Sequence, residues 1–152
     1  MSKTPFVYLA SQSPRRRQLL EQLGVAYELL LPDEDEDAEA LEVVLPNEAP
    51  RTYVQRVTGL KLQAALARMK RRGLPTAPVL CSDTTVALGK TILGKPESPA
   101  DAARILGLLS GQNHRVLTAV AVALGIEPAL IVEADGIHHQ RVSVPFAHGV
   151  AV

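Results

Sequence analysis

Serines and arginines that could hold phosphate gather in one short segment, Ser11-Gln12-Ser13-Pro14-Arg15-Arg16-Arg17. Ser13 and Pro14 are typical of a helix N-cap and first helical position, which places the three arginines in the first turn. A cation there costs about 0.3 to 1 kcal/mol, because the helix dipole is positive at this end. Free backbone N–H groups, serine hydroxyls and forked guanidinium groups together suit a phosphate. The segment predicts a phosphate site, with a solvated surface helix as the alternative and Arg17 as the arginine expected to be plain surface.

A carboxylate that follows an apolar run is the second feature that could do chemistry. Val79-Leu80-Cys81 has the character of a buried strand, and Asp83 comes at its end. In open α/β sheets ligands gather at the carboxyl ends of strands, so a carboxylate there can hold a metal ion or activate water. The alternative is a simple turn in which the side chain of Asp83 accepts a hydrogen bond from a nearby backbone N–H.

Two lysines could add positive charge to such a site. Lys61 lies within an apolar helical stretch, so it either extends along the surface or points into a cleft. The segment 89–95 has the spacing of a phosphate-binding P-loop, but Pro96 replaces the Ser or Thr that would hold magnesium. A P-loop also needs a strand before it and a helix directly after it, and its phosphate-binding loop does not carry the apolar residues found within this segment. We therefore reject a P-loop and keep Lys95 as a single phosphate contact.

Acidic residues are concentrated in one segment, because seven of the sixteen lie between Asp33 and Glu42. Magnesium prefers one or two carboxylates together with water and phosphate oxygens, so this segment could supply a metal ligand. Most of these carboxylates should simply be solvated. The four histidines and the single cysteine show no zinc-ligand spacing, and we expect no zinc.

The elements that must position these residues follow from apolar periodicity and from helix start and stop signals. Strands are expected at residues 6–10, 27–31, 79–81 continuing extended through 85–88, 115–124, 129–133 and 140–144. Helices are expected from Ser13 to Gly24, over residues 51–72, and from Ser98 to Gly111, with an exposed loop between the second strand and the long helix. This alternation predicts an α/β domain with a mixed or mostly parallel sheet flanked by helices.

Composition narrows the classes of partner. Lysine plus arginine equals aspartate plus glutamate at 16 each, so no overall basic field favours nucleic acid or an anionic membrane surface. No apolar run reaches the roughly 18 to 20 residues that a membrane span needs. The single cysteine, Cys81, excludes an internal disulfide, and a reducing cytoplasmic location is expected.

Taken in order, these motifs resemble the Maf family of nucleotide pyrophosphatases over roughly residues 5 to 124. The matching motifs are Leu9-Ala10-Ser11-Gln12-Ser13-Pro14-Arg15-Arg16, the acidic segment with Glu36, Tyr53-Val54-Gln55-Arg56 with Lys61, Ser82-Asp83-Thr84-Thr85-Val86, Ile92-Leu93-Gly94-Lys95-Pro96, and His114-Arg115-Val116 with Thr118. The resemblance implies a Maf/ITPase-like fold with an anticodon-like two-lobed architecture. It also implies hydrolysis of a nucleoside triphosphate between the α and β phosphates, with a divalent cation such as Mg²⁺ or Mn²⁺.

The resemblance also implies roles for individual residues. Phosphate would be bound by Ser11, Ser13, Arg15 and Arg16, and neutralised by Lys61 and Lys95. Glu36 and Asp83 would hold the metal ion, and Asp83 would also orient the attacking water. Ser-Pro-Arg-Arg together with Asp-Thr is similar to the branch that acts on dTTP and UTP. The alternative function is a catalytically inactive nucleotide-binding or regulatory module, linked to cell division and septum formation.

The sequence departs from the family pattern after Leu124. Members continue with Gly-Glu-Pro and then Lys-Ala-Gly-x-Tyr-x-Ile-Gln-Gly, whereas the last lysine here is Lys95. We expect one domain over residues 1–152, with 125–152 as a divergent tail and the second lobe incomplete, through truncation or a shifted reading frame near residue 125. A shorter natural variant is the alternative. Uncovered apolar faces and strand edges would favour pairing between chains, as in a homodimer.

Overall fold

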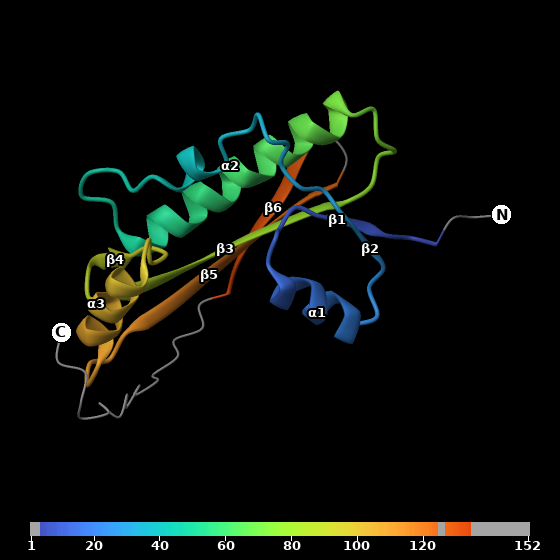
Figure 1. Ribbon diagram of the computed structural model, residues 1–152. Helices are drawn as coiled ribbons and strands as arrows, with labels where there is room; N and C mark the ends of the chain where they lie inside the picture. Colours follow the sequence, from blue (N-terminus) through green and yellow to red (C-terminus); the bar gives the residue numbers. More distant parts are fainter. Residues whose placement is uncertain (1–3, 125–126, 135–152) are drawn as a thin grey trace.

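A mixed sheet flanked by helices forms the body of the protein (Figure 1). The structure is a computed structural model and describes residues 4–124 together with the backbone of residues 127–134. In chain order the elements are β1 (Val7–Leu9), α1 (Pro14–Gln22), β2 (Tyr27–Leu29), the 3₁₀ helix η1 (Glu39–Glu42), α2 (Pro50–Arg71), β3 (Val79–Leu88), β4 (Thr91–Leu93), α3 (Pro99–Leu109), β5 (Arg115–Leu124) and β6 (Glu127–Ala134). The strand expected at 140–144 lies outside the described residues.

The sheet has the order β2-β1-β3-β5-β6, and β4 pairs with β3 outside this path. Strand β1 runs parallel to both β2 and β3, whereas β3 is antiparallel to β4 and β5, and β5 is antiparallel to β6. The mixed α/β sheet expected from the sequence is therefore confirmed. No helix in the described ranges combines the length and the apolar character that crossing a membrane requires.

Strand β3 extends well beyond the end of β1, and this difference in length creates an open edge. The pairing with β1 covers Val79 and Leu80 only, and the pairing with β4 begins at Val86. Between these two partners, residues 82–85 of β3 have no neighbouring strand on this side, although β5 pairs with them on the other side. The loop that leaves β1 and enters α1 lies at this opening, which is the carboxyl end of the parallel strands.

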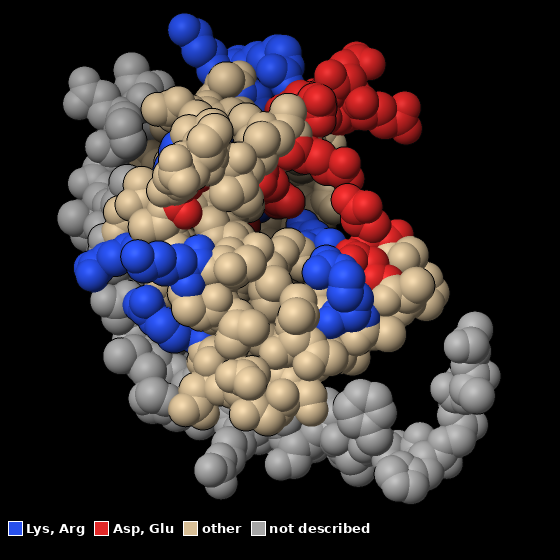
Figure 2. Space-filling view, turned by 90° about the vertical axis from the view of Figure 1, so that its left-hand side faces the viewer, with Lys and Arg blue, Asp and Glu red and all other residues tan. Residues whose placement is uncertain are grey.

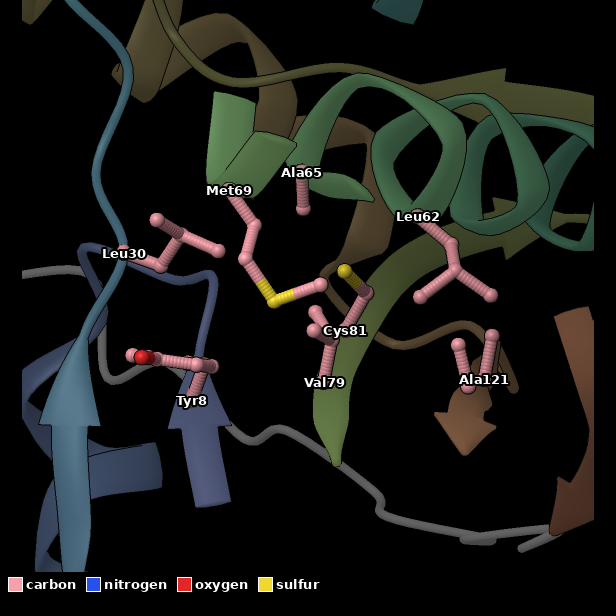
Figure 3. Packing of buried hydrophobic residues seen from close by; sticks show 9 residues of the cluster. Tyr8, Leu30, Leu62, Ala65, Met69, Val79, Cys81 and Ala121 are labelled. Carbon is pink, nitrogen blue, oxygen red and sulfur yellow. The ribbon is translucent and has the colours of Figure 1, made fainter. Parts of the chain in front are cut away.

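Helix α2 packs across one face of the sheet, over β3 and β5 (Figure 1). Figure 3 shows Ala65 and Met69 of α2 pointing toward Val79 and Cys81 of β3. On β5 the residues that face this helix include three buried alanines, Ala119, Ala121 and Ala123. Small side chains on the sheet let a helix approach closely, because protein interiors pack without voids. The helix therefore lies near the backbone of β3 and β5.

The helix boundaries agree with the sequence signals. Pro14 opens α1, and Gly24 follows its end with a φ of 69°. Ser98 caps α3, because its hydroxyl accepts a hydrogen bond of 3.0 Å from the backbone N–H of Asp101. The expected extended stretches 79–81 and 85–88 are one continuous strand, β3, so Asp83 lies within the strand and not, as we expected, at its end.

Two short elements were not expected, β4 and η1. Gly89, with a φ of 61°, forms the turn that brings β4 back against β3. The residues of β4 lack a strong strand pattern of their own, so this strand depends on its pairing with β3. The 3₁₀ helix η1 lies in the acidic segment that the sequence indicated to be an exposed loop.

Candidate functional site

Four charged residues from four segments meet at the open edge of β3, and we name them the Lys61 cluster: Glu42, Lys61, Asp83 and Lys95. Lys61 Nζ donates to Glu42 Oε1 at 2.7 Å and to Asp83 Oδ1 at 2.9 Å. Lys95 Nζ lies 3.4 Å from both carboxylate oxygens of Glu42. On the side of the molecule where β4 and α3 lie in Figure 1, acidic and basic side chains meet (Figure 2).

The cluster is partly buried, and its charges support one another. The side chain of Lys61 is 22% exposed and that of Asp83 is 12% exposed. Burial alone would lower the pKa of Lys61, but hydrogen bonds to Asp83 and Glu42 outweigh it and raise this pKa above its ordinary value. Burial likewise opposes the charge of Glu42, but the hydrogen bond from Lys61 prevails and lowers the pKa of Glu42. Of the two alternatives for Lys61, the structure shows the side chain pointing inward.

Arg16 fastens the start of α1 to the same edge of β3. Its Nη1 donates to Ser11 Oγ at 3.1 Å and to the backbone carbonyl oxygen of Ser82 at 2.9 Å, and its Nη2 donates to Thr84 Oγ1 at 3.3 Å. Burial lowers the pKa of the Arg16 guanidinium, an effect that the nearby carboxylate of Asp83 opposes. The serine and arginine segment and Asp83 therefore belong to one region of the molecule.

The hydroxyl of Thr84 also contacts the neighbouring strand. Thr84 Oγ1 and Thr118 Oγ1 are 2.9 Å apart, so β5 supports the residue that Arg16 contacts. The guanidinium of Arg16 is thus engaged by three oxygen atoms of the protein itself. This arrangement suits a clamp between α1 and β3 better than a free phosphate ligand.

The remaining residues of the first segment are more open. Ser13 has the extended backbone of an N-cap, yet its side chain makes no capping hydrogen bond, which leaves its hydroxyl available to a ligand. Arg15 is exposed, and no acidic residue lies in the first turn of α1. Arg17 is half-buried, although we expected plain surface. The amino end of α1 therefore offers N–H groups, a hydroxyl and Arg15 to an anion.

Glu36 lies in a second group of charges, the Arg68 cluster: Asp33, Glu36, Arg68, Arg71 and Arg72. Arg68 binds Glu36 through a two-point contact, with Nε to Oε2 at 2.9 Å and Nη2 to Oε1 at 2.8 Å. The third nitrogen, Nη1, donates to the carbonyl oxygen of Leu30 at 2.8 Å. The hydrogen bonds from Arg68 lower the pKa of Glu36 to about 2, and the backbone N–H of Asp33 and the charge of Arg71 contribute further.

The structure does not bring Glu36 together with Asp83. Arg68 follows Lys61 by seven residues on α2, which is roughly 10 Å along a helix. Glu42, from the same acidic segment, occupies the position beside Lys61 and Asp83. The expected pairing of Glu36 with Asp83 therefore differs from the structure, because the two-point contact with Arg68 holds Glu36 elsewhere.

Glu42 is the site residue that the sequence pattern did not identify. Its backbone is fixed by Tyr53, whose hydroxyl donates to the carbonyl oxygen of Glu42 at 2.8 Å. This contact joins residues that are 11 positions apart and belongs to no periodic pattern. The one available signal was membership of the acidic segment, which Glu42 shares with six other carboxylates.

The site lies at the uncovered edge of β3. A hollow of about 630 Å³ lies elsewhere, at the start of β1, where its lining includes Phe6, Val25 and Pro75. That hollow contains no member of the Lys61 cluster, so the charged groups and not the hollow identify the candidate site. Within the described part of the chain, no group of three or more His, Cys, Asp or Glu side chains could hold a metal ion.

The chain is similar to curated proteins over most of its own length. A dTTP/UTP pyrophosphatase from Albidiferax ferrireducens is 74% identical over 117 residues, which cover 77% of this chain and 58% of that relative. A protein of the same name from a Polaromonas species is 66% identical over 125 residues, which cover 82% of this chain and 62% of the relative. The chain thus spans about three fifths of the length of the curated relatives it matches.

A solved structure shows the same fold at low sequence identity. The structure of a HAM1 protein from Coxiella burnetii matches with a TM-score of 0.52 and 17% identity, over 86% of this chain and 68% of that chain. The family model described as Maf-like protein matches residues 6–147, which is most of the sequence. The chain therefore belongs to the Maf-like protein family.

Proposed function

We propose that this chain contributes the triphosphate-binding edge of a nucleoside triphosphate pyrophosphatase that acts on dTTP and UTP. The observation that carries the proposal is the contact of Lys61 with Asp83 at the open edge of β3, beside the amino end of α1. The names of the relatives, which are 66% and 74% identical, support dTTP and UTP as the substrate class.

Binding of the phosphate chain follows from the distribution of donors around this edge. The amino end of α1 supplies backbone N–H groups, Ser11 and Ser13 supply hydroxyls, and Arg15 supplies an exposed guanidinium. Lys61 and Lys95 supply two ammonium groups from the opposite side of the edge. Arg16 positions the segment through its contacts with β3, so its contribution to binding is indirect.

The donor chemistry of the site fits a divalent cation such as Mg²⁺ or Mn²⁺. Asp83 and Glu42 present carboxylate oxygens to the same ammonium group, and hard cations are held by one or two carboxylates together with water and phosphate oxygens. We therefore propose Asp83 with Glu42 as the ligand pair. The assignment of Glu36 stays a prediction, which requires its carboxylate to leave Arg68.

When bound, such a cation neutralises phosphate oxygens and polarises the scissile anhydride. Asp83, with its carboxylate at the edge, accepts a hydrogen bond from a water molecule and orients it toward the α phosphate. Lys61 and Lys95 offset the charge of the leaving pyrophosphate. The reaction thus depends on positioning and charge, and it needs no nucleophilic side chain.

The test is incubation of the full chain with dTTP or UTP and Mg²⁺, followed by separate measurement of pyrophosphate and orthophosphate. Pyrophosphate together with the nucleoside monophosphate is the expected result, and 7-methyl-GTP serves as the matched control substrate. Release of orthophosphate, or of no product, would contradict the proposal. Stabilisation by nucleotide without pyrophosphate release would favour the inactive binding module. The cytoplasmic location and the link to septum formation stay predictions.

A further inference from the structure

The Lys61 cluster carries no net charge as it stands. Its two lysines contribute +2, and its two carboxylates, Glu42 and Asp83, contribute −2, which gives zero. A triphosphate carries several negative charges, so a neutral cluster offers it little attraction. One carboxylate must therefore give up its contact with the lysines before they can bind phosphate.

Glu42 is the carboxylate whose contacts a phosphate can replace. It accepts from Lys61 at 2.7 Å and lies 3.4 Å from Lys95, so it occupies both ammonium groups that the proposed function assigns to phosphate. A phosphate oxygen accepts the same hydrogen bonds as a carboxylate oxygen. The side chain of Glu42 is 25% exposed, compared with 12% for Asp83, which lies within β3.

The backbone at the end of η1 is held by two side chains of α2. The hydroxyl of Tyr53 donates to the carbonyl oxygen of Glu42 at 2.8 Å, and Arg56 Nη2 donates to the carbonyl oxygen of Val43 at 2.7 Å. Arg56 is itself fixed by Glu48, with Nε to Oε2 at 2.6 Å, and lies over the ring of Tyr53. Two residues of α2 thus hold the end of η1, while the Glu42 carboxylate is held by ion pairs.

We propose that Glu42 is an internal anion that occupies Lys61 and Lys95 until a triphosphate chain replaces it, and that Tyr53 and Arg56 are positioning residues that hold Glu42 there. The inference rests on the proposed function, since it assigns phosphate to the same lysines. The replaced carboxylate becomes available to a divalent cation, which couples metal binding to phosphate binding. Nucleotide affinity in the absence of metal is then held low by the protein itself.

The first experiment measures binding of inorganic tripolyphosphate to the full chain by calorimetry in the presence of EDTA. Glu42→Gln should bind about threefold to tenfold more tightly than the unchanged chain, because a partly exposed ion pair no longer competes. Glu39→Gln is the matched control, since Glu39 is an exposed carboxylate of the same 3₁₀ helix. Its affinity should stay within about twofold of the unchanged chain.

The second experiment repeats the titration with Mg²⁺ in place of EDTA. Glu42→Gln should now lose its advantage, because the unchanged chain can transfer the Glu42 carboxylate to the cation. A merely structural effect of the substitution would be the same with and without metal. The dependence on Mg²⁺ therefore separates the internal anion from a change in folding.

Tyrosine substitutions test the positioning role. Tyr53→Phe removes only the hydroxyl that holds Glu42, and it should tighten tripolyphosphate binding in EDTA by about twofold to threefold. Tyr8→Phe is the matched control, because the Tyr8 hydroxyl donates to the carbonyl oxygen of Pro75 at the same distance of 2.8 Å, away from the Lys61 cluster. Tyr8→Phe should leave tripolyphosphate affinity unchanged.

The outcomes separate this inference from the proposed function. Equal tripolyphosphate affinity for Glu42→Gln, Glu39→Gln and the unchanged chain in EDTA would overturn the inference, even if dTTP is cleaved. Tighter binding by Glu42→Gln that persists unaltered in Mg²⁺ would overturn the coupling to metal. A third outcome is that Glu42→Gln binds tripolyphosphate more tightly in EDTA but not in Mg²⁺, while the unchanged chain releases no pyrophosphate from dTTP. This outcome would support the role of Glu42 as an internal anion and would overturn only the proposed function.

Discussion

Helix α2 carries two ion clusters that use the same acidic segment in different ways. In the Arg68 cluster a guanidinium binds Glu36 at two points and also holds the carbonyl oxygen of Leu30. In the Lys61 cluster a single ammonium group bridges Glu42 and Asp83. The forked, planar guanidinium fixes geometry, whereas an ammonium group is a point charge whose partners can exchange. The comparison indicates that the Arg68 cluster anchors the acidic segment, and it supports the proposal that the Lys61 cluster binds a ligand.

Burial follows the same division. The side chain of Arg68 is 5% exposed and that of Lys61 is 22% exposed, beside an edge of β3 that no strand covers. Breaking a buried, multiply bonded pair leaves polar groups without partners, which is costly. If Lys61 loses one of its carboxylate partners, the ammonium group and the released carboxylate can still form hydrogen bonds with water or with phosphate. We therefore expect the acidic segment to be held more firmly at Glu36 than at Glu42.

The largest effect should come from Asp83→Asn, which removes one negative charge of the Lys61 cluster and keeps the shape of the side chain. Pyrophosphate release from UTP with Mg²⁺ should fall by about 1000-fold, because both metal binding and water orientation are lost. The melting temperature should change little, since Lys61 keeps its contact with Glu42. Full activity in a folded Asp83→Asn variant would end the proposed mechanism.

A pair of methionine substitutions compares the two clusters directly. Arg68→Met should lower the free energy of unfolding by about 3 kcal/mol, because Glu36 and the Leu30 carbonyl oxygen lose their shared donor. Lys61→Met should lower it by about 1 kcal/mol or less, while greatly weakening tripolyphosphate binding. Urea denaturation measures the first quantity and calorimetry the second. Equal losses of stability would remove the distinction between the clusters.

Arg15 and Arg16 of α1 allow the same comparison between a residue that binds the ligand and a residue that anchors the structure. Arg15→Ala should weaken binding of a non-hydrolysable UTP analogue about tenfold and leave the melting temperature unchanged, since Arg15 is exposed. Arg16→Ala should instead destabilise the protein by about 2 kcal/mol, because it removes three hydrogen bonds to protein oxygens. Calorimetry together with urea denaturation of both variants measures these effects. The roles would be reversed if Arg15→Ala unfolded more easily than Arg16→Ala.

The smallest effect concerns pH and the Arg68 cluster. The pKa of Glu36 is about 2 in the folded protein, below its ordinary value of 4.5. The ionised Glu36 carboxylate therefore contributes its full stabilisation above pH 4.5, and this contribution declines as the pH falls toward 2. The stability difference between the unchanged chain and Glu36→Gln should therefore shrink by about 0.5 kcal/mol between pH 6 and pH 4, after allowance for solvent screening. Urea unfolding at the two pH values measures it, and a constant difference would contradict the assignment.

The sequence predicted the elements that have their own start and stop signals. Pro14 and Gly24 bound α1, and Ser98 caps α3, as their types indicated. The elements β4 and η1 were not predicted, because their segments have the composition of a glycine-lysine turn and of an acidic loop, and both depend on contacts with β3 and α2. The boundaries followed from local chemistry, whereas the short elements required the tertiary structure.

The candidate site shows the same division. Residue type and position within the motifs indicated Ser11, Lys61 and Asp83, and the structure places them around one edge. Composition could not distinguish Glu36 from Glu42, because both belong to one run of carboxylates. The hydroxyl of Tyr53 and the guanidinium of Arg68 decide which of them faces Asp83, and these contacts join residues 11 and 32 positions apart, which no local pattern predicts.

The alanines of β5 have a consequence for reactivity that their own chemistry does not suggest. Ala119 is the register partner of Asp83 and is 1% exposed beneath α2. A bulkier residue such as valine at this position would lift the helix away from the strands, and Lys61 would rise with it. The distance between Lys61 on α2 and Asp83 on β3 therefore depends on the small side chains of β5, which set the spacing between the helix and the sheet.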